Sequence, residues 1–352
     1  MTKHIKENER LRLRKIVESF PKLTITVLAD LVADEFVFGE ISRVSREAPV
    51  LILKHCDRTV VPGGGANAIY NLADLGVNVL PVGVVGDDEP GKQLLRAFRH
   101  KQIPVSGVLK DKSYTTVTKT RILAGFAHTA GQQVVRLDRE PVEGPNSHLR
   151  RELVLSAREY ARASDALLVS DYGYGAATPT LLNVIREKRG LDKLLVTLDS
   201  RHRLLEFSSI TAATPNESEV EEALGIRIGN GNDIDNAWER LLAAGDQIAG
   251  TMNLESLLIT RGKDGMVVFP RRHKPVDIPI HGSDEVADVT GAGDTVIAAF
   301  TAGLAAGATA EEAAQLANYA GGIVVMKRGT ATVGQQELLE ALEKAPPAVR
   351  EH

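Results

Sequence analysis

Hydrophobic positions follow two different periods along the chain, and their alternation predicts an α/β body. Runs of strand type occur at 23–29, 79–82, 166–170, 194–198, 210–213, 257–260 and 266–269. Helical patterns lie between them, for example at 149–163, 178–188 and 236–249. Because strands that alternate with helices form βαβ units, this order predicts a parallel sheet with helices on both faces.

A second set of apolar runs is not followed by helical patterns. These runs lie at 36–41, 50–54, 115–123 and 133–138. They predict a small, mostly separate sheet, with strands within about 36–55 and 115–139. Strands away from the main core expose edges and a face, and pairing with a second copy would cover both. We therefore expect a homodimer through this inserted sheet.

The two ends of the chain differ from the body. Residues 1–22 form an amphipathic pattern that predicts a helical extension packed on the body, with apolar positions at Leu11, Leu13, Ile16, Val17 and Phe20. The main domain is expected at 23–345. Residues 346–352 are predicted to be a frayed tail.

Composition narrows the functional classes. The 352 residues are 43% hydrophobic, which is ample for a large core, and the net charge of -4 argues against a nucleic-acid partner. The single cysteine, Cys56, fits a reducing compartment. The charged N-terminus lacks the apolar core of a signal peptide, and the longest apolar stretch, 296–308, is too short to cross a bilayer. These features predict a cytoplasmic protein without a membrane partner.

The strongest chemical motif is the run from Asp288 to Asp294. Gly291, Ala292 and Gly293 precede an apolar helical pattern, so free backbone amides at a helix N-terminus could bind an anion. Asp294 would lie in the first helical turn, where an ionised carboxylate is favoured and can take a proton from a hydroxyl. The alternative is a capped core helix with an N-terminal charge.

A glycine-rich motif precedes the helical run that ends near Leu75. Gly63, Gly64 and Gly65 would let the backbone approach a ligand closely, and Asn67 can hydrogen-bond to hydroxyl groups. The motif matches neither a Walker A loop nor the dinucleotide fingerprint. The alternative is a glycine-rich turn with a helix cap.

Two further motifs follow predicted strands. Asn216 and Glu219 are three residues apart and offer oxygen ligands suited to Mg²⁺. Taken alone, the pair is better explained as an N-cap with a capping-box glutamate. The turn from Thr260 to Gly265 follows a strand at the edge where α/β sheets bind ligands. Its alternative is a plain β-hairpin turn.

Charged side chains gather near the first strand and the inserted sheet. Asp30 and Asp34 could accept hydrogen bonds from sugar hydroxyls, or could belong to a solvated loop with a helix cap. The basic residues on or beside the inserted strands could together hold a substrate phosphate: Arg43, Arg46, Lys54, Lys119, Arg121 and Arg136. Singly, each could be a solvated surface residue.

These motifs together resemble a known family. The segments 63–67 and 288–294 are similar to the two signature motifs of the ribokinase-like (PfkB) carbohydrate kinases, and the Asn216–Glu219 pair resembles that family's magnesium motif. The similarity covers roughly 23–340. It implies a ribokinase-like doubly wound αβα sandwich with a small β-sheet lid, and ATP-dependent phosphorylation of a sugar hydroxyl.

The resemblance also implies roles for single residues. Asp294 would be the base, and the anion hole would be formed by Gly291, Ala292 and Gly293. Sugar contacts would come from Asp34, Gly64, Gly65 and Asn67. Positions around the nucleotide would be Asn216, Thr260, Gly262, Gly265 and Asn318. Glu219 and Asn216 would hold Mg²⁺ through water, and a monovalent cation is a further candidate cofactor beside ATP and Mg²⁺.

Within the family, the inserted sheet is similar to the lid of the heptose 7-phosphate kinases of ADP-heptose synthesis. The similar runs are 42–50, 118–121, 136–138 and 168–172. They imply phosphorylation of D-glycero-β-D-manno-heptose 7-phosphate at O1, with the sugar phosphate contacted by Arg43, Lys119, Arg121, Arg136 and Asp138. Many such kinases carry a C-terminal nucleotidyltransferase domain. This chain ends at His352 and resembles the kinase-only form.

Three departures from the family pattern leave the sugar open. The loop at 124–130 is longer than expected, Asp199-Ser200-Arg201 replaces the more usual Asp-Pro-Lys, and Ala29-Asp30 stands where Gly-Asp is common. Alternative acceptors are ribose, 2-keto-3-deoxygluconate and a fructose phosphate. The alternative from another class is a catalytically silent sugar-binding homologue.

Overall fold

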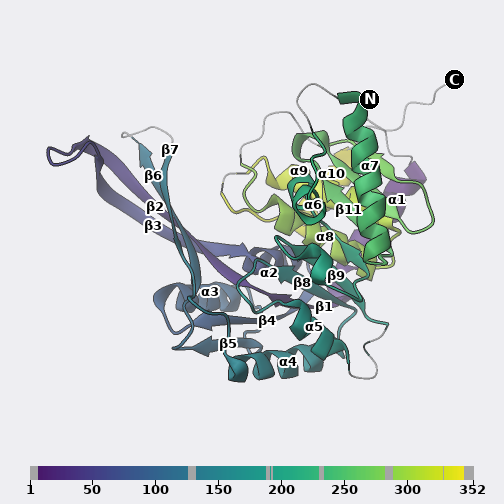
Figure 1. Cartoon of the computed structure of the whole chain (residues 1–352), viewed down its shortest axis with the longest axis horizontal. Helices are drawn as coiled ribbons and strands as arrows, with labels where there is room; N and C mark the ends of the chain where they lie inside the picture. The colour runs from purple at the N-terminus through teal and green to yellow at the C-terminus, as the bar shows by residue number, and fades with distance from the viewer. Residues whose placement is uncertain are drawn as a thin grey trace.

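The computed structural model describes residues 7–125, 132–187, 191, 193–229, 234–281, 288–327 and 329–344. Within these residues, nine strands form the central sheet in the order β13-β12-β11-β10-β9-β8-β1-β4-β5 (Figure 1). Their bounds are β1 Thr24–Ala29, β4 Asn78–Gly86, β5 Val108–Asp111, β8 Ala166–Asp171, β9 Leu195–Ser200, β10 Ala212–Ala213, β11 Ser256–Thr260, β12 Met266–Pro270 and β13 Val276–Ile278.

The sheet is parallel from β5 to β11, as the alternating pattern predicts. At one edge the sheet departs from the parallel arrangement, because β12 and β13 run antiparallel. The physical reason is connection length, because the short turn between β11 and β12 can only return the chain in the antiparallel direction. The two short strands β5 and β13 were not predicted.

Helices cover both faces of the sheet and form two apolar cores. One core contains side chains from the helices α1 Glu7–Glu18, α2 Gly65–Asp74, α3 Glu89–His100, α8 Ala292–Ala305, α9 Ala310–Val324 and α10 Gln335–Lys344. The other contains side chains from α4 Ser147–Ala161, α5 Pro179–Arg186, α6 Glu217–Leu224 and α7 Ile234–Thr251. This layering is the doubly wound αβα sandwich expected from the sequence.

The N-terminal helix α1 belongs to the first core. Leu13, Ile16 and Val17 are buried there together with Phe20, which follows the helix, whereas Leu11 is exposed. The helix also contacts α10. Among the described residues, no helix is both long enough and apolar enough to cross a membrane.

The lid is a second, four-stranded sheet in the order β3-β2-β6-β7. Its strands are β2 Leu31–Val44, β3 Leu51–Gly64, β6 Val117–Gly125 and β7 Gln132–Arg139. In Figure 1 the strands leave the body as a long arm, with the β2–β3 hairpin reaching farthest. The lid strands are longer than predicted, since β2 begins just after β1 and β3 runs directly into α2. Asp34 therefore lies in a strand and not in a loop.

Candidate active site

The N-terminus of α8 presents backbone amides at the carboxyl edge of the sheet. Gly291 is the N-cap residue with φ 80°, and a Cβ there would lie 2.5 Å from Asn67 Nδ2, so glycine is required on both counts. Among the described residues, the amides of Gly293 and Asp294 have no protein acceptor. These amides can therefore bind an anion.

Asp294 lies beside this anion site and is 3% exposed. Its Oδ1 accepts a hydrogen bond from Tyr172 Oη at 2.7 Å, and its Oδ2 accepts one from Asn67 Nδ2 at 3.0 Å. Burial, and next the Asp199 carboxylate, raise the pKa of Asp294 to about 7, while the two hydrogen bonds act in the opposite direction. A carboxylate with a pKa near the working pH is suited to act as a general base.

A buried polar network orients Asn67. Asn71 Nδ2 donates to Asn67 Oδ1 at 3.2 Å, and Thr295 Oγ1 donates to Asn71 Oδ1 at 3.0 Å. The Asn67 carbonyl oxygen is thus engaged, and its amide nitrogen faces Asp294. The network ties α2 to α8, so the two signature segments meet at the same point.

The glycines before Asn67 serve close packing. A Cβ on Gly63 would lie 2.2 Å from Asp34 Oδ2, and one on Gly65 would lie 2.5 Å from Ala29 Cβ. Gly64 has φ 51° and its position allows Val32 and Tyr172 to approach. The motif brings α2 against β1 and brings Asp34 against the backbone.

The root of the lid places charged side chains near Asp294. Arg121 Nη1 donates to Asp34 Oδ1 at 2.6 Å, and Thr330 Oγ1 donates to Asp34 Oδ2 at 3.3 Å. Lys119 is 7% exposed, and its Nζ lies 5.2 Å from the centre of the Tyr172 ring. Asp34, Lys119 and Arg121 are therefore brought together at the base of the lid.

Asp30 has a different role from Asp34. Its carboxylate accepts hydrogen bonds from the amides of Tyr172 at 2.9 Å, Tyr174 at 2.9 Å and Ala176 at 2.8 Å. Burial, and next the Asp171 carboxylate, raise the pKa of Asp30 to about 6. Asp30 shapes the loop after β8, so the expected pairing of Asp30 with Asp34 as sugar ligands is wrong.

A cavity of about 380 Å³ adjoins the N-terminus of α8. Its lining residues are Asp171, Tyr172, Asp199, Arg201, His202, Thr214, Asn216, Ser218, Glu219, Glu222, Thr260 and Gly293. Thr260 N donates to Pro215 O at 3.0 Å, which joins the end of β11, where Thr260 lies, to the segment before α6 that carries Asn216. Four of the residues predicted from sequence therefore share one cavity: Asn216, Glu219, Thr260 and Gly293.

Asn216 and Glu219 form a capping box at the start of α6. Asn216 Oδ1 accepts from Glu219 N, and Glu219 Oε2 accepts from Asn216 N, each at 2.9 Å. The capping box, which was the other explanation for this pair, is therefore formed. It leaves Glu219 Oε1 without a hydrogen-bond partner among the described residues, so a ligand role is compatible with the cap.

Asp199 and Glu219 are two carboxylates in the same cavity. Burial, then the Glu219 carboxylate, raises the pKa of Asp199 to about 8, and burial raises that of Glu219 to about 7. Such a donor pair fits a hard divalent cation, which would lower both pKa values. The described part of the chain holds no cluster of three or more His, Cys, Asp or Glu side chains able to bind a metal.

The remaining residues predicted around the nucleotide lie near the edge strands β12 and β13 of the central sheet. Gly265 has φ 83°, and a Cβ there would lie 2.2 Å from Ile278 O, so packing against β13 requires glycine. Gly262 has open space around it. Asn318 on α9 donates to Pro279 O at 2.8 Å and accepts from His281 N at 3.4 Å, which fixes the chain beyond β13. The 260–265 turn is also the β-hairpin named as its alternative.

The other predicted phosphate contacts lie on β7 and near the far end of β2. Arg136 Nε donates to Asp138 Oδ1 at 2.8 Å on β7, where Arg136 faces Arg121 and Asp138 faces Lys119 in register. Arg43 lies beyond the end of the β2–β6 pairing, opposite Ile52 on β3. Because an extended strand advances about 3.3 Å per residue, Arg43 is not brought to this cluster within one chain.

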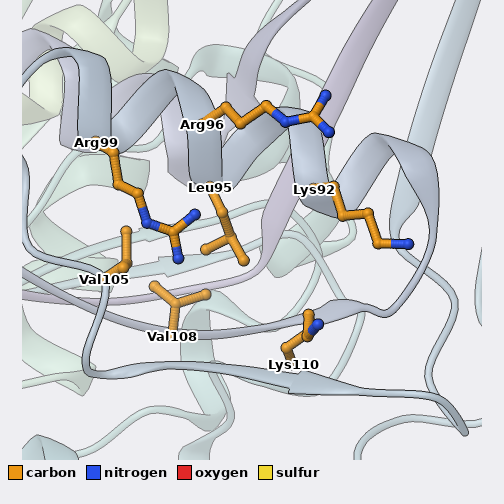
Figure 2. A pocket seen from close by; sticks show the side chains of 7 residues that line it. All are labelled: Lys92, Leu95, Arg96, Arg99, Val105, Val108 and Lys110. Atoms are coloured by element: carbon orange, nitrogen blue, oxygen red, sulfur yellow. The ribbon is translucent and has the colours of Figure 1, made fainter.

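A separate basic hollow lies between α3 and β5, with a volume of about 240 Å³ (Figure 2). Its lining residues are Lys92, Leu95, Arg96, Arg99, Val105, Val108 and Lys110. Lys92 and Lys110 lie 3.5 and 3.1 Å from Asp87 Oδ1. No predicted site residue lines it. Cationic side chains with their stems on an apolar floor are common on protein surfaces.

Two residues of the site were missed by sequence reasoning. Tyr172 was noted only within the 168–172 run and Asp199 only as part of a departure from the family pattern. Tyr172 directly follows β8 and Asp199 lies near the end of β9, both at the carboxyl edge of the sheet, which was the available signal.

Comparison with known proteins agrees with this geometry. The family model for pfkB family carbohydrate kinase matches residues 33–337. "Bifunctional protein HldE" of Geobacter metallireducens is 38% identical over 95% of this chain and 66% of its own length, and HldE of Gluconobacter oxydans is 35% identical over 94% and 67%. The chain thus spans about two thirds of the length of these curated relatives.

Solved structures share the fold. Arabidopsis thaliana ribokinase, complexed with ribose and ATP, has a TM-score of 0.69 at 19% identity, with 91% of this chain and 99% of that chain covered. Phosphofructokinase-2 of Escherichia coli, in complex with substrates and products, has a TM-score of 0.71 at 16% identity, with 92% and 99% covered. The chain belongs to the pfkB family of carbohydrate kinases and is a sugar kinase with the ribokinase-like fold.

Proposed function

We propose that this sugar kinase transfers the γ-phosphoryl group of ATP to O1 of D-glycero-β-D-manno-heptose 7-phosphate. The observation that carries the chemistry is the buried Asp294 carboxylate beside the free amides of α8. The sugar assignment is supported by the resemblance of the lid to heptose 7-phosphate kinases, and by HldE relatives that match along nearly the whole chain.

Asp294 takes the proton from the acceptor hydroxyl. Asn67 and Tyr172 each donate to a different oxygen of its carboxylate and so fix its orientation. The amides of Gly293 and Asp294 stabilise the negative charge on the transferring phosphoryl group. Catalysis then comes mainly from positioning and electrostatics, as in other phosphoryl transfers.

The cavity beside α8 suits the nucleotide and its metal. Thr260, at the end of β11, and Asn216, just before α6, lie side by side at the wall of this cavity. Gly262 lies in the turn that follows β11. Asp199 and Glu219 would hold Mg²⁺, largely through water. When bound, the ion neutralises charge on the phosphates. A monovalent cation remains a candidate cofactor.

The lid root suits a phosphorylated sugar. Lys119 and Arg121 place two cations beside Asp34, and Arg136 and Asp138 face them on β7. A bound sugar would contact Asp34, Asn67 and the backbone at Gly64 and Gly65. A guanidinium and an ammonium in this position favour an acceptor with its own phosphate over a neutral nucleoside.

The test is coupled ADP release with a panel of acceptors: heptose 7-phosphate, fructose 6-phosphate, ribose and 2-keto-3-deoxygluconate. We expect turnover of heptose 7-phosphate at the highest kcat/KM. Turnover of ribose or 2-keto-3-deoxygluconate without turnover of the heptose would overturn the sugar assignment. ADP release from none of them, with intact folding, would favour the silent homologue.

We also propose a cytoplasmic homodimer that pairs through the lid. All eight residues of β7 are exposed, including the apolar Val134, Val135 and Leu137. Exposed apolar side chains on an edge strand of a β-sheet often mark a surface that another protein chain covers. Sedimentation at micromolar concentration tests this proposal, and a monomer there would contradict it.

A further inference from the structure

A line of contacts runs from the lid to the catalytic carboxylate through one aromatic ring. The Tyr172 hydroxyl donates to Asp294 Oδ1 at 2.7 Å. The Lys119 ammonium of β6 lies over the same ring, 5.2 Å from its centre. Tyr172 therefore contacts the base at its polar end and the lid at its face.

The main chain holds Tyr172 firmly in this place. Its amide donates to the buried Asp30 carboxylate, which also binds the amides of Tyr174 and Ala176. The ring lies against the glycine-rich loop, where a Cβ on Gly64 would come within 3.2 Å of Tyr172 Cε2. A side chain fixed at both its backbone and its ring can hold a partner with little loss of freedom on catalysis.

We propose that Tyr172 is a positioning residue that keeps Asp294 ionised and aimed at the acceptor hydroxyl, and that Lys119 over its ring couples the lid to the base. The inference deepens the proposed function, since it rests on Asp294 as the base. It assigns a separate role to the hydroxyl and to the ring.

The electrostatic reason lies in the groups that face Asp294. Asp199 from β9 and Asp34 from β2 are carboxylates that disfavour its charge, and burial acts in the same direction. Asn67 from α2 and Tyr172 are the two donors that oppose them. The pKa of Tyr172 itself is raised well above its usual range, first by burial and then by Asp294, so the phenol remains a donor at working pH.

Removing one of the two donors should therefore raise the pKa of Asp294. Tyr172→Phe deletes the donor and keeps the ring, whereas Tyr172→Leu deletes both. Tyr174→Phe is the matched control, because Tyr174 lies in the same loop with its hydroxyl on Glu140, 2.9 Å away, and not on Asp294. A charge-assisted hydrogen bond corresponds to about one pKa unit or somewhat more.

The experiment is a pH titration of the Asp294 carboxyl carbon by ¹³C NMR, with the signal assigned through its loss in Asp294→Asn. We expect an upward shift of about one unit in Tyr172→Phe and none in Tyr174→Phe. With a turned-over sugar, kcat/KM of Tyr172→Phe should fall roughly tenfold below the pKa and approach the parent value above it. KM for the sugar should rise in Tyr172→Leu but not in Tyr172→Phe.

An unshifted Asp294 titration in Tyr172→Phe overturns the inference, and so does a pH-independent loss of activity. Equal KM values in the Phe and Leu variants overturn the coupling through Lys119. The NMR readout needs no sugar. If the titration shifts while no acceptor is phosphorylated, the proposed function fails and the role of Tyr172 in ionising Asp294 stands.

Discussion

Charged side chains in the body and in the lid lie in different environments. In the body, the carboxylates of Asp30 and Asp294 are buried and are compensated by hydrogen-bond donors. On β7, the edge strand of the lid, Arg136 and Asp138 form an ion pair, and the whole strand is exposed. A reacting group gains from a dry, fixed environment, whereas a recognition surface must remain open to a substrate or to a second copy.

The lid root is intermediate and belongs functionally to the body. The side chains of Arg121 and Asp34 are 15% and 6% exposed, and their ion pair lies where β2 and β6 leave the main sheet. Charged side chains are therefore more exposed on the edge strand β7 than on β2 and β6 at the lid root. Substitutions of the catalytic carboxylate, at the lid root and on β7 should therefore differ in their effect in that order.

Asp294→Asn should have the largest effect. Loss of a general base lowers the rate by about 10²–10⁴-fold, and the amide cannot accept the proton. ADP release at saturating substrate measures this, and circular dichroism of the variant provides the control for folding. Turnover equal to that of the parent protein would refute Asp294 as the base.

Arg121→Ala should affect binding more than the chemical step. It removes a cation from the sugar side and leaves the buried Asp34 carboxylate without its guanidinium, so we expect KM for the sugar phosphate to rise about 10–100-fold. Arg121→Lys retains the positive charge, so its KM for the sugar phosphate should lie between the values of the parent protein and of Arg121→Ala. A loss confined to kcat would show that Arg121 belongs to the catalytic group.

Stability should fall as the pH rises through the titration of Asp294. Its folded pKa of about 7 lies above the value of about 3.9 in the unfolded chain, so the folded state binds more protons between these values. Asp294→Asn has no carboxyl group to titrate, so its stability should not fall with pH for this reason. Its Tm should exceed that of the parent at pH 8 and match it at pH 4, and an equal difference at both pH values would contradict the assignment.

Leu137→Asp should dissociate the proposed dimer with little effect on folding. Leu137 is 61% exposed on β7, so a charge there is hydrated in the monomer and desolvated in a lid–lid interface. Sedimentation velocity should show a monomer with unchanged Tm. Leu155→Asp on α4, also exposed but outside the lid, is the matched control and should leave the dimer intact.

Arg99→Ala in the basic hollow should have the smallest effect. The Arg99 side chain is exposed and makes no hydrogen bond or ion pair within the described residues, so its loss should change the free energy of unfolding by no more than about 0.5 kcal/mol. Turnover should be unchanged. A clear loss of activity would show that exposed cations outside the lid also contribute to the reaction.

The hydrophobic pattern predicted the main strands and the separate lid because both periods are local properties. It missed β5 and β13, which are short strands at the two edges of the sheet. It also made β2 and β3 too short, since the register that extends them depends on pairing with each other. In the site, the small residues at 291–293 pointed to an anion site, but nothing local indicated that Tyr172 and Asp199 face the same carboxylate.

The sequence by itself determined the family, the anion-binding helix start and the position of a carboxylate within it. Glycine at 291 and the apolar helix after Asp294 are local requirements that a linear motif records. Only the tertiary structure decided how Asp294 is charged. Its pKa depends on burial, on the Asp199 carboxylate and on donors from Asn67 and Tyr172, which reach it from separate parts of the chain. Electrostatic energy depends on distances in space, and spacing along the chain does not supply them.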